Sequence, residues 1–193
     1  RVRYIPIKII LPRQTPDQLD IAMKKPVINI DQLVTTPISE RMPNAPEKYQ
    51  GASVAPISAQ IGAQRLGYNL TVVPPGKSAF PFHNHYGNEE MFFILEGQGE
   101  LRYGAQRHPL RAGDVIACPP GGAETAHQIS NTSTTSTLRY LAVSTLRSPD
   151  MFHYPDSGKT VASHYLDRDG LGFPDAIRLR NRAEHILDYW DGE

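Results

Sequence analysis

The sequence predicts an all-β protein folded as an antiparallel barrel or jelly roll, and the middle of the chain supplies two observations for this. Between residues 61 and 148, short segments rich in β-branched and aromatic residues recur at regular intervals. Turns rich in glycine and proline separate these segments. Both features are typical of closed antiparallel sheets. The 193 residues contain no internal repeat and are enough for one well-cored domain with extensions.

Each expected strand is bounded by a recognisable turn. Residues 65–73 have mixed faces and end at Pro74-Pro75-Gly76. Residues 90–95 are nearly all apolar, which is typical of a strand buried on both sides or of one with a lipophilic inner face, and a hairpin turn follows at residues 97–99. The remaining expected strands are residues 100–104, 107–110, 115–118 and 137–144.

An N-terminal arm, residues 1–60, precedes the expected barrel of residues 61–148. It is rich in proline with short apolar pieces, which predicts a segment lying over the barrel and adding an edge strand. Residues 1–22 are expected to be a vector-derived or upstream extension, because Met23 has the setting of a natural start. The alternative that residues 1–22 belong to the native chain stays open.

A C-terminal tail, residues 149–193, follows the expected barrel. Its pattern is looser, and it predicts loops that pack on the barrel or on a partner. Residues 174–190 carry apolar positions with partly helical spacing, which leaves room for one short helix with Asp175 as its cap.

Composition and charge exclude several classes of partner. Twenty basic and twenty acidic residues give a formal net charge of zero, so no electrostatic attraction to nucleic acid or to an anionic membrane is expected. The single cysteine, Cys118, excludes an internal disulfide and suits a reducing cytoplasm. No apolar run approaches the roughly 20 residues of a membrane-spanning helix. A cytoplasmic protein with a small-molecule partner is therefore expected.

Three histidines and a carboxylate predict one metal site. His83 and His85 are two residues apart, so on a strand both side chains leave the same face. Glu90 can face them from a neighbouring strand, because the plausible turn at residues 86–88 lets the chain double back. His127 completes the set if one more strand of the barrel brings it to the same place.

The donor set predicts one divalent ion of a transition metal. Three imidazoles and one carboxylate leave two positions of an octahedron open for water or substrate. Iron, manganese, nickel, cobalt and zinc all suit such a set, and the sequence does not choose among them. Glu89 is the rival carboxylate, but it would point outward when Glu90 points inward.

Residues 76–97 resemble the first motif of the cupin superfamily, G-x5-H-x-H-x3,4-E-x6-G. His85, Glu90 and Gly97 fit that spacing without adjustment, whereas six residues separate Gly76 from His83 instead of five. A second stretch resembles the other cupin motif, G-x5-P-x-G-x2-H-x3-N. It runs from Gly113 to Asn131.

The second stretch departs from its motif at one point. Gly113, Pro119 and Gly121 fit, and Asn131 follows His127 at the motif spacing. Five residues lie between Gly121 and His127, where the motif has two, so an insertion lengthens that loop. The resemblance covers residues 66–146.

The resemblance implies a double-stranded β-helix barrel with the metal at His83, His85, Glu90 and His127. Gly76, Gly97, Gly113, Pro119, Gly121 and Asn131 would be its structural motif residues. The whole chain further resembles small bacterial single-domain cupins that carry a PDSGK segment, here residues 155–159. Such cupins commonly pair through apolar arm segments, so a homodimer is expected.

Residues beyond the ligands are candidates to line a pocket. If Glu90 faces inward, strand alternation also directs Phe92 and Ile94 inward. The full set of pocket candidates is Arg65, Tyr68, Phe80, Phe82, Phe92, Ile94, Gln128 and Tyr140. Lys159 lies in a stretch like the end of a phosphate-binding loop, but the earlier glycine that such a loop needs would fall at His153. Lys159 is therefore expected to anchor the tail or to lie near the barrel mouth.

Two functions from different classes follow. The first is a metal-dependent enzyme acting on a small organic substrate, with Glu90 as a base as in some cupins, and with dioxygenase-like chemistry ahead of sugar isomerase or epimerase chemistry. An apolar wall from Phe92 and Ile94 favours the former, and the lack of a Lys/Arg cluster near the motifs disfavours the latter. The second is a non-catalytic cupin that binds or senses a small molecule around a structural metal.

Overall fold

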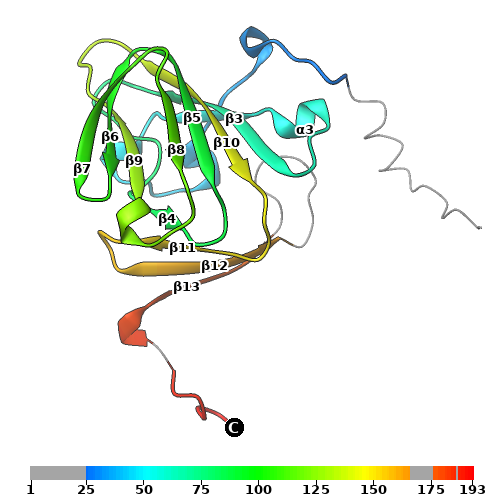
Figure 1. The fold of residues 1–193 in the computed structure, drawn as a ribbon, viewed down its shortest axis with the longest axis vertical. Coiled ribbons are helices and arrows are strands. Elements are labelled where there is room, and N and C mark those ends of the chain that lie inside the picture. The colour runs from blue at the N-terminus through cyan, green and yellow to red at the C-terminus, as the bar shows by residue number, and fades with distance from the viewer. Residues whose placement is uncertain (1–24, 166–175, 186) are drawn as a thin grey trace, which may run out of the picture.

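The structure, a computed structural model, describes residues 25–165, 176–185 and 187–193. It is built mostly of antiparallel strands, with only short helical turns (Figure 1). Two sheets face each other as the barrel and a third lies across one end of it. The predicted all-β fold class is therefore confirmed.

The first barrel sheet has six strands. Their order is β1 (Thr36–Pro37), β2 (Ser53–Pro56), β3 (Leu66–Val73), β10 (Leu138–Thr145), β5 (Glu90–Glu96) and β8 (Val115–Cys118). The opposing sheet has the order β7 (Gln106–Arg111), β6 (Gln98–Tyr103) and β9 (His127–Asn131). Most of these strands coincide with the segments that the sequence predicts as strands. β5 is not buried on both sides: Phe92 and Ile94 are buried on one face, whereas Met91 and Phe93 are exposed on the other.

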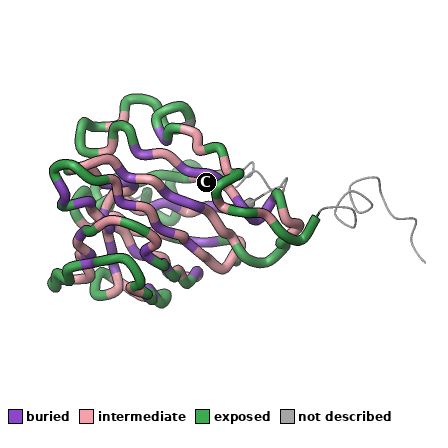
Figure 2. Tube along the Cα trace, turned by 90° about the horizontal axis from the view of Figure 1, so that it is seen from above, coloured by how far each residue is buried: buried purple, intermediate pink, exposed green. Residues whose placement is uncertain are grey.

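The hydrophobic core lies between these two sheets. Ile94, Leu138 and Val73 from the first sheet are fully buried, and they share one cluster with Leu101 and Ile129 from the second. Figure 2 shows buried positions alternating with less buried ones along the strands. Burying one face of each sheet against the other is the dominant stabilising term in such a barrel.

The tail forms a third sheet, with the order β13 (Ala176–Arg182), β12 (Lys159–Tyr165), β11 (Asp150–Tyr154) and β4 (Asn84–His85). Within residues 174–190, for which the sequence leaves room for one short helix, the structure has the strand β13 and then the single helical turn η4 (Ala183–His185). The expected cap, Asp175, lies outside the described residues. Seven residues of β13 pair with seven of β12, and the alternating Arg-Leu-Arg pattern at 178–180 suits that pairing better than a helix. The sheet joins the barrel through β4, which carries His85.

The helical elements are short and lie outside the sheets. They are η1 (Ile30–Gln32), α2 (Ile38–Arg41), η2 (Glu47–Tyr49), α3 (Ser58–Ile61), η3 (Ala123–Thr125) and η4 (Ala183–His185). Among the described residues, none of these helices has the length and apolar composition needed to cross a bilayer. The arm supplies β1 and β2 to the edge of the first sheet.

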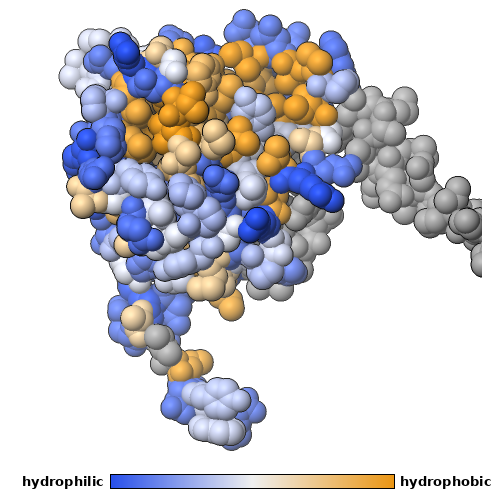
Figure 3. All heavy atoms as spheres, in the orientation of Figure 1, coloured by the Kyte–Doolittle hydropathy of each residue, from blue (hydrophilic) through white to orange (hydrophobic). Residues whose placement is uncertain are grey.

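Apolar side chains remain exposed on both the arm and the barrel. Val27 and Val34 of the arm are among them, as are Met91, Phe93 and Val115 on β5 and β8. Figure 3 shows apolar residues gathered over the barrel, above a more polar tail sheet. The homodimer stays a prediction.

Gly97 occupies a turn that excludes any side chain. Its φ is +87°, and a Cβ there would lie 2.3 Å from the backbone oxygen of Thr137. Gly113 has a similar φ of +94°, but a Cβ there would meet nothing within 4 Å. Both positions therefore have a backbone conformation that would strain any other residue, and they differ in the space available for a side chain.

We predict that Gly97→Ala destabilises the fold by about 2 kcal/mol more than Gly113→Ala. The Gly113 variant bears only the left-handed strain, about 1–2 kcal/mol, whereas the Gly97 variant adds overpacking against backbone. Urea unfolding followed by circular dichroism measures both. Equal losses in the two variants would contradict the close approach at Gly97.

Candidate metal centre

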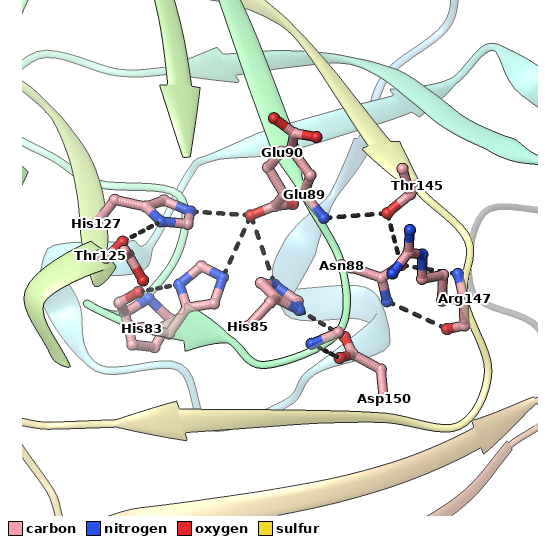
Figure 4. A network of polar contacts seen from close by, with 12 residues as sticks. His83, His85, Asn88, Glu89, Glu90, Thr125, His127, Thr145, Arg147 and Asp150 are labelled. Carbon is pink, nitrogen blue, oxygen red and sulfur yellow. Dashed lines mark hydrogen bonds and ion pairs between the residues drawn. The ribbon is translucent and has the colours of Figure 1, made fainter. Parts of the chain in front are cut away.

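Four side chains converge at the end of the barrel that the tail sheet covers (Figure 4). His83 precedes β4 and forms an isolated bridge with His127, the first residue of β9. His85 lies on β4 and Glu90 is the first residue of β5. Residues more than 40 positions apart are thus brought together because the strands that carry them meet at one end of the barrel.

The carboxylate of Glu90 is the point of convergence. Its Oε2 lies 2.9 Å from Nε2 of His127, 3.5 Å from Nε2 of His85 and 3.7 Å from Nε2 of His83. Ligand atoms of His83, Glu90 and His127 all lie within 4.8 Å of one another, so these three alone could hold a metal ion. His85 joins them through the shared Glu90 oxygen.

The other nitrogen of each histidine already faces an acceptor. His83 Nδ1 lies 2.8 Å from the Pro81 carbonyl oxygen and His127 Nδ1 lies 3.3 Å from that of Thr125. His85 Nδ1 lies 2.7 Å from Asp150 Oδ2. These acceptors hold the three rings so that each Nε2 is directed at Glu90, and His127 Nε2 forms a hydrogen bond with Glu90 Oε2 at 2.9 Å.

This arrangement fits a metal ion on chemical grounds. Three Nε2 atoms and a carboxylate oxygen face one another, and a metal ion would take the place of the proton that His127 and Glu90 share. Acceptors that converge in a poorly solvated place repel unless a cation lies between them. A mixed nitrogen and oxygen set of this kind suits a divalent transition metal.

The electrostatics favour the donor forms that a metal requires. Burial, helped by repulsion from His127 and His85, lowers the pKa of His83 to about 4. Burial alone would raise the pKa of Glu90, but its hydrogen bond with His127 and the charges of His85 and His83 outweigh burial and lower that pKa to about 2. Near neutral pH, His83 is therefore neutral and Glu90 is ionised, as ligands must be.

Residues 69–144 match the cupin domain family model. The chain contains a cupin domain. An uncharacterised protein of Methanocaldococcus jannaschii is 37% identical over 60 residues, which are 31% of this chain and 45% of that protein. An oxalate-binding protein of Thermotoga maritima is 38% identical over 71 residues, 37% of this chain and 54% of that protein. The chain thus spans about half the length of each of these relatives.

A solved structure extends the likeness beyond the cupin domain. A sugar phosphate isomerase of the cupin superfamily from Silicibacter pomeroyi superposes with a TM-score of 0.64 over 86% of this chain and 98% of that one. The sequence identity is 21%, so this likeness establishes a shared fold. Tail and arm are therefore part of an architecture that another cupin also has.

Two adjacent glutamates, one just before β5 and one at its first residue, go to different places. Glu90 faces the histidines, whereas Glu89 is exposed and its backbone N–H donates to Thr145 Oγ1 at 3.0 Å. Strand alternation separates the two carboxylates, so the structure brings Glu90 and not Glu89 to the centre.

Six of the eight pocket candidates lie beside the centre or in or near the hydrophobic core. Phe92 lies beside the centre, with its ring 5.6 Å from that of His127. Ile94 and Tyr140 are part of the core, Phe82 is buried, and Phe80 packs against the core cluster. Gln128 holds the Phe80 carbonyl through its Nε2 at 2.7 Å.

Two pocket candidates were wrong. Arg65 is exposed and precedes β3. Tyr68 packs against a second cluster, formed by Ala55, Ile57 and Leu70 on the outer side of the first sheet. Strand alternation explains this, because Thr71, three positions along β3, is the residue that contacts Tyr140 inside.

The motif residue Asn131 holds the turn that follows β9. Its Nδ2 donates to the carbonyl oxygens of Val73 at 2.9 Å and Ser136 at 2.8 Å. Its Oδ1 accepts from the Ser133 backbone N–H at 2.9 Å. The loop insertion before His127 forms η3, and the Thr125 carbonyl at its end is the one that faces His127 Nδ1.

Sequence reasoning missed three residues of the tail. Asp150 is buried and bonds both His85 and the Gly87 backbone N–H, the latter at 3.1 Å. Phe152 packs on His85 with ring centres 5.3 Å apart, and Tyr154 stacks on His83 at 5.8 Å. No local signal marks them, because only the pairing of β11 with β4 brings them to the site.

We predict that Asp150→Asn weakens divalent metal binding by about 10- to 100-fold, the usual effect of losing a carboxylate behind a ligating histidine. An amide is a weaker acceptor for His85 Nδ1 and carries no charge. Competition with a coloured chelator measures the affinity. Glu96→Gln is the matched control, because Glu96 pairs with Arg139 on the surface. An unchanged affinity in Asp150→Asn would contradict this role.

Proposed function

We propose that this cupin binds one divalent metal ion through His83, His85, Glu90 and His127 and acts as a metal-dependent enzyme on a small organic substrate. The observation that carries the proposal is the convergence of Nε2 atoms on Glu90 Oε2 while each Nδ1 faces another acceptor. The metal is iron, manganese, nickel, cobalt or zinc, since the donor set accepts each of them.

Solvent access supports a working site over a sealed structural one. The side chains of His83, His85 and Glu90 retain 16%, 17% and 18% of their exposure, whereas His127 retains 4%. A small molecule can therefore approach from the side of His83, His85 and Glu90. The rings of Phe152 and Tyr154 lie beside that approach and limit the water around it.

The geometry favours proton transfer as the reaction. When bound, the divalent ion supplies a Lewis acid that polarises a substrate oxygen. Glu90 is ionised near neutral pH and supplies the carboxylate that would take up a proton from a substrate carbon. Asp150 keeps His85 fixed in position throughout.

The surroundings of the site favour isomerase or epimerase chemistry over dioxygenase-like chemistry. The apolar wall expected from Phe92 and Ile94 gives less support to an aromatic substrate, because Ile94 is fully buried in the core. The tail sheet adds cations that lie far from the motifs in the sequence, because β13 carries Arg178, Arg180 and Arg182. A polar, oxygen-rich substrate suits these surroundings better.

A binding role is the second candidate. The Thermotoga maritima relative is an oxalate-binding protein, 38% identical over the 71 residues it shares with this chain. A metal with open positions can hold a dicarboxylate without turning it over. Exchange of substrate hydrogen in D2O separates the two roles, because a proton-transfer enzyme incorporates deuterium into small hydroxycarbonyl compounds and a binding protein does not.

We predict about one divalent ion per chain after reconstitution, measured by plasma mass spectrometry on dialysed protein. Glu90→Gln removes a charged ligand and should lose more affinity than the roughly 10- to 100-fold typical of outer partners. Glu89→Gln is the matched control and should keep the ion. No ion in the wild-type chain, or equal loss in both variants, would contradict the proposed centre.

A further inference from the structure

One face of the tail sheet continues the surroundings of the metal centre. Residues paired across antiparallel strands share a face of their sheet. His85 pairs with Phe152, Phe152 with Val161, and Val161 with Arg180. The row beside it runs from Tyr154 to Lys159 to Arg182. Lys159, Arg180 and Arg182 therefore lie on the same face as the ligand His85.

Tyr154 connects this cationic face to the centre. Its ring stacks on that of His83 at 5.8 Å with an interplanar angle of 24°. Lys159 Nζ lies over the same ring, 4.1 Å from its centre. The Tyr154 ring thus contacts both the Lys159 ammonium and the ligand candidate His83. A small substrate could therefore reach Lys159 with one end and the metal centre with the other.

Among the described residues, the cations of this face have no acidic partner, unlike several other cations of the barrel. Arg102, Arg107, Arg139 and Lys77 each form an ion pair with a carboxylate. Within the described part of the chain, Lys159, Arg180 and Arg182 form none. Burial and the charges of Arg180 and Arg182 lower the pKa of Lys159, which shows that these cations are close enough to repel one another. A bound anion would relieve that repulsion.

The turn that carries Lys159 is held in place. Asp156, in the turn between β11 and β12, accepts two hydrogen bonds from Arg102 of β6, at 2.8 and 2.9 Å. Arg182 Nε donates to the Ser157 carbonyl oxygen at 3.2 Å. Lys159 itself is held over the Tyr154 ring, with Nζ 4.1 Å from its centre. The cations are therefore positioned before any ligand arrives.

We propose that Lys159, Arg180 and Arg182 form a subsite for the phosphate group of a small phosphorylated substrate whose other end reaches the metal centre. The inference rests on the proposed metal-dependent function and names its substrate class. Three cations match a phosphate dianion better than a single carboxylate, and guanidinium groups bind phosphate oxygens in pairs. The substrate would be a phosphorylated hydroxycarbonyl compound.

Calorimetric titration of the metal-loaded protein with glycerol 3-phosphate tests the subsite, with glycerol and glycerate as the uncharged and carboxylate counterparts. We expect glycerol 3-phosphate to bind at least about 10-fold more tightly than either, the usual scale for a charged hydrogen-bonded group. Lys159→Gln and Arg180→Gln should each lose about 10-fold in affinity, and Lys159→Arg should recover most of it. Arg139→Gln, on another part of the surface, should bind like the wild type.

Metal content and thermal melting of the same variants separate this inference from the proposed function. Both should be unchanged in Lys159→Gln and Arg180→Gln, because neither residue is a ligand candidate. Equal binding of glycerate and glycerol 3-phosphate would overturn the phosphate assignment, as would full affinity in Lys159→Gln. Loss of metal in these variants would also overturn it, because the cations would then support the centre and not the ligand.

Discussion

The rest of the site depends on four potential metal-ligand atoms, three imidazole nitrogens and one carboxylate oxygen, that the barrel brings together. The Nε2 atoms of His83, His85 and His127 face Glu90 Oε2, while the Nδ1 atoms are occupied elsewhere. The barrel holds this arrangement because β4 and the first residues of β5 and β9 lie at the same end of the barrel. Such a cluster is unfavourable by itself in a partly buried setting and favourable around a cation. Metal binding and the stability of this end of the barrel are therefore coupled.

The barrel and the tail contribute different residues to the site. The cupin domain at residues 69–144 contains all four ligand candidates. The tail contributes Asp150 behind His85, the rings of Phe152 and Tyr154, and the cationic face of β12 and β13. A barrel shared by proteins of many activities can thus keep its metal chemistry while a C-terminal sheet determines which substrates reach it.

Sequence reasoning succeeded where a local pattern sets the structure. Alternating strands and glycine turns predicted the barrel, and the spacing of His83, His85 and Glu90 predicted their convergence. It failed where only long-range pairing decides. Residues 176–182 form a strand because β12 offers them a partner, and Asp150 meets His85 through the pairing of β11 with β4, 65 positions apart along the chain. The outward turn of Tyr68 likewise depends on which face of β3 meets the core.

Anomalous diffraction from crystals of metal-loaded protein, recorded on both sides of the absorption edge of the bound metal, addresses the convergence directly. We expect one anomalous peak per chain, at about 2.0–2.2 Å from the three Nε2 atoms and from an oxygen of Glu90. Asp150 should still accept the hydrogen bond from His85 Nδ1 in that structure. A peak elsewhere in the chain, or a histidine cluster without one in crystals that hold the metal, would contradict the proposed centre.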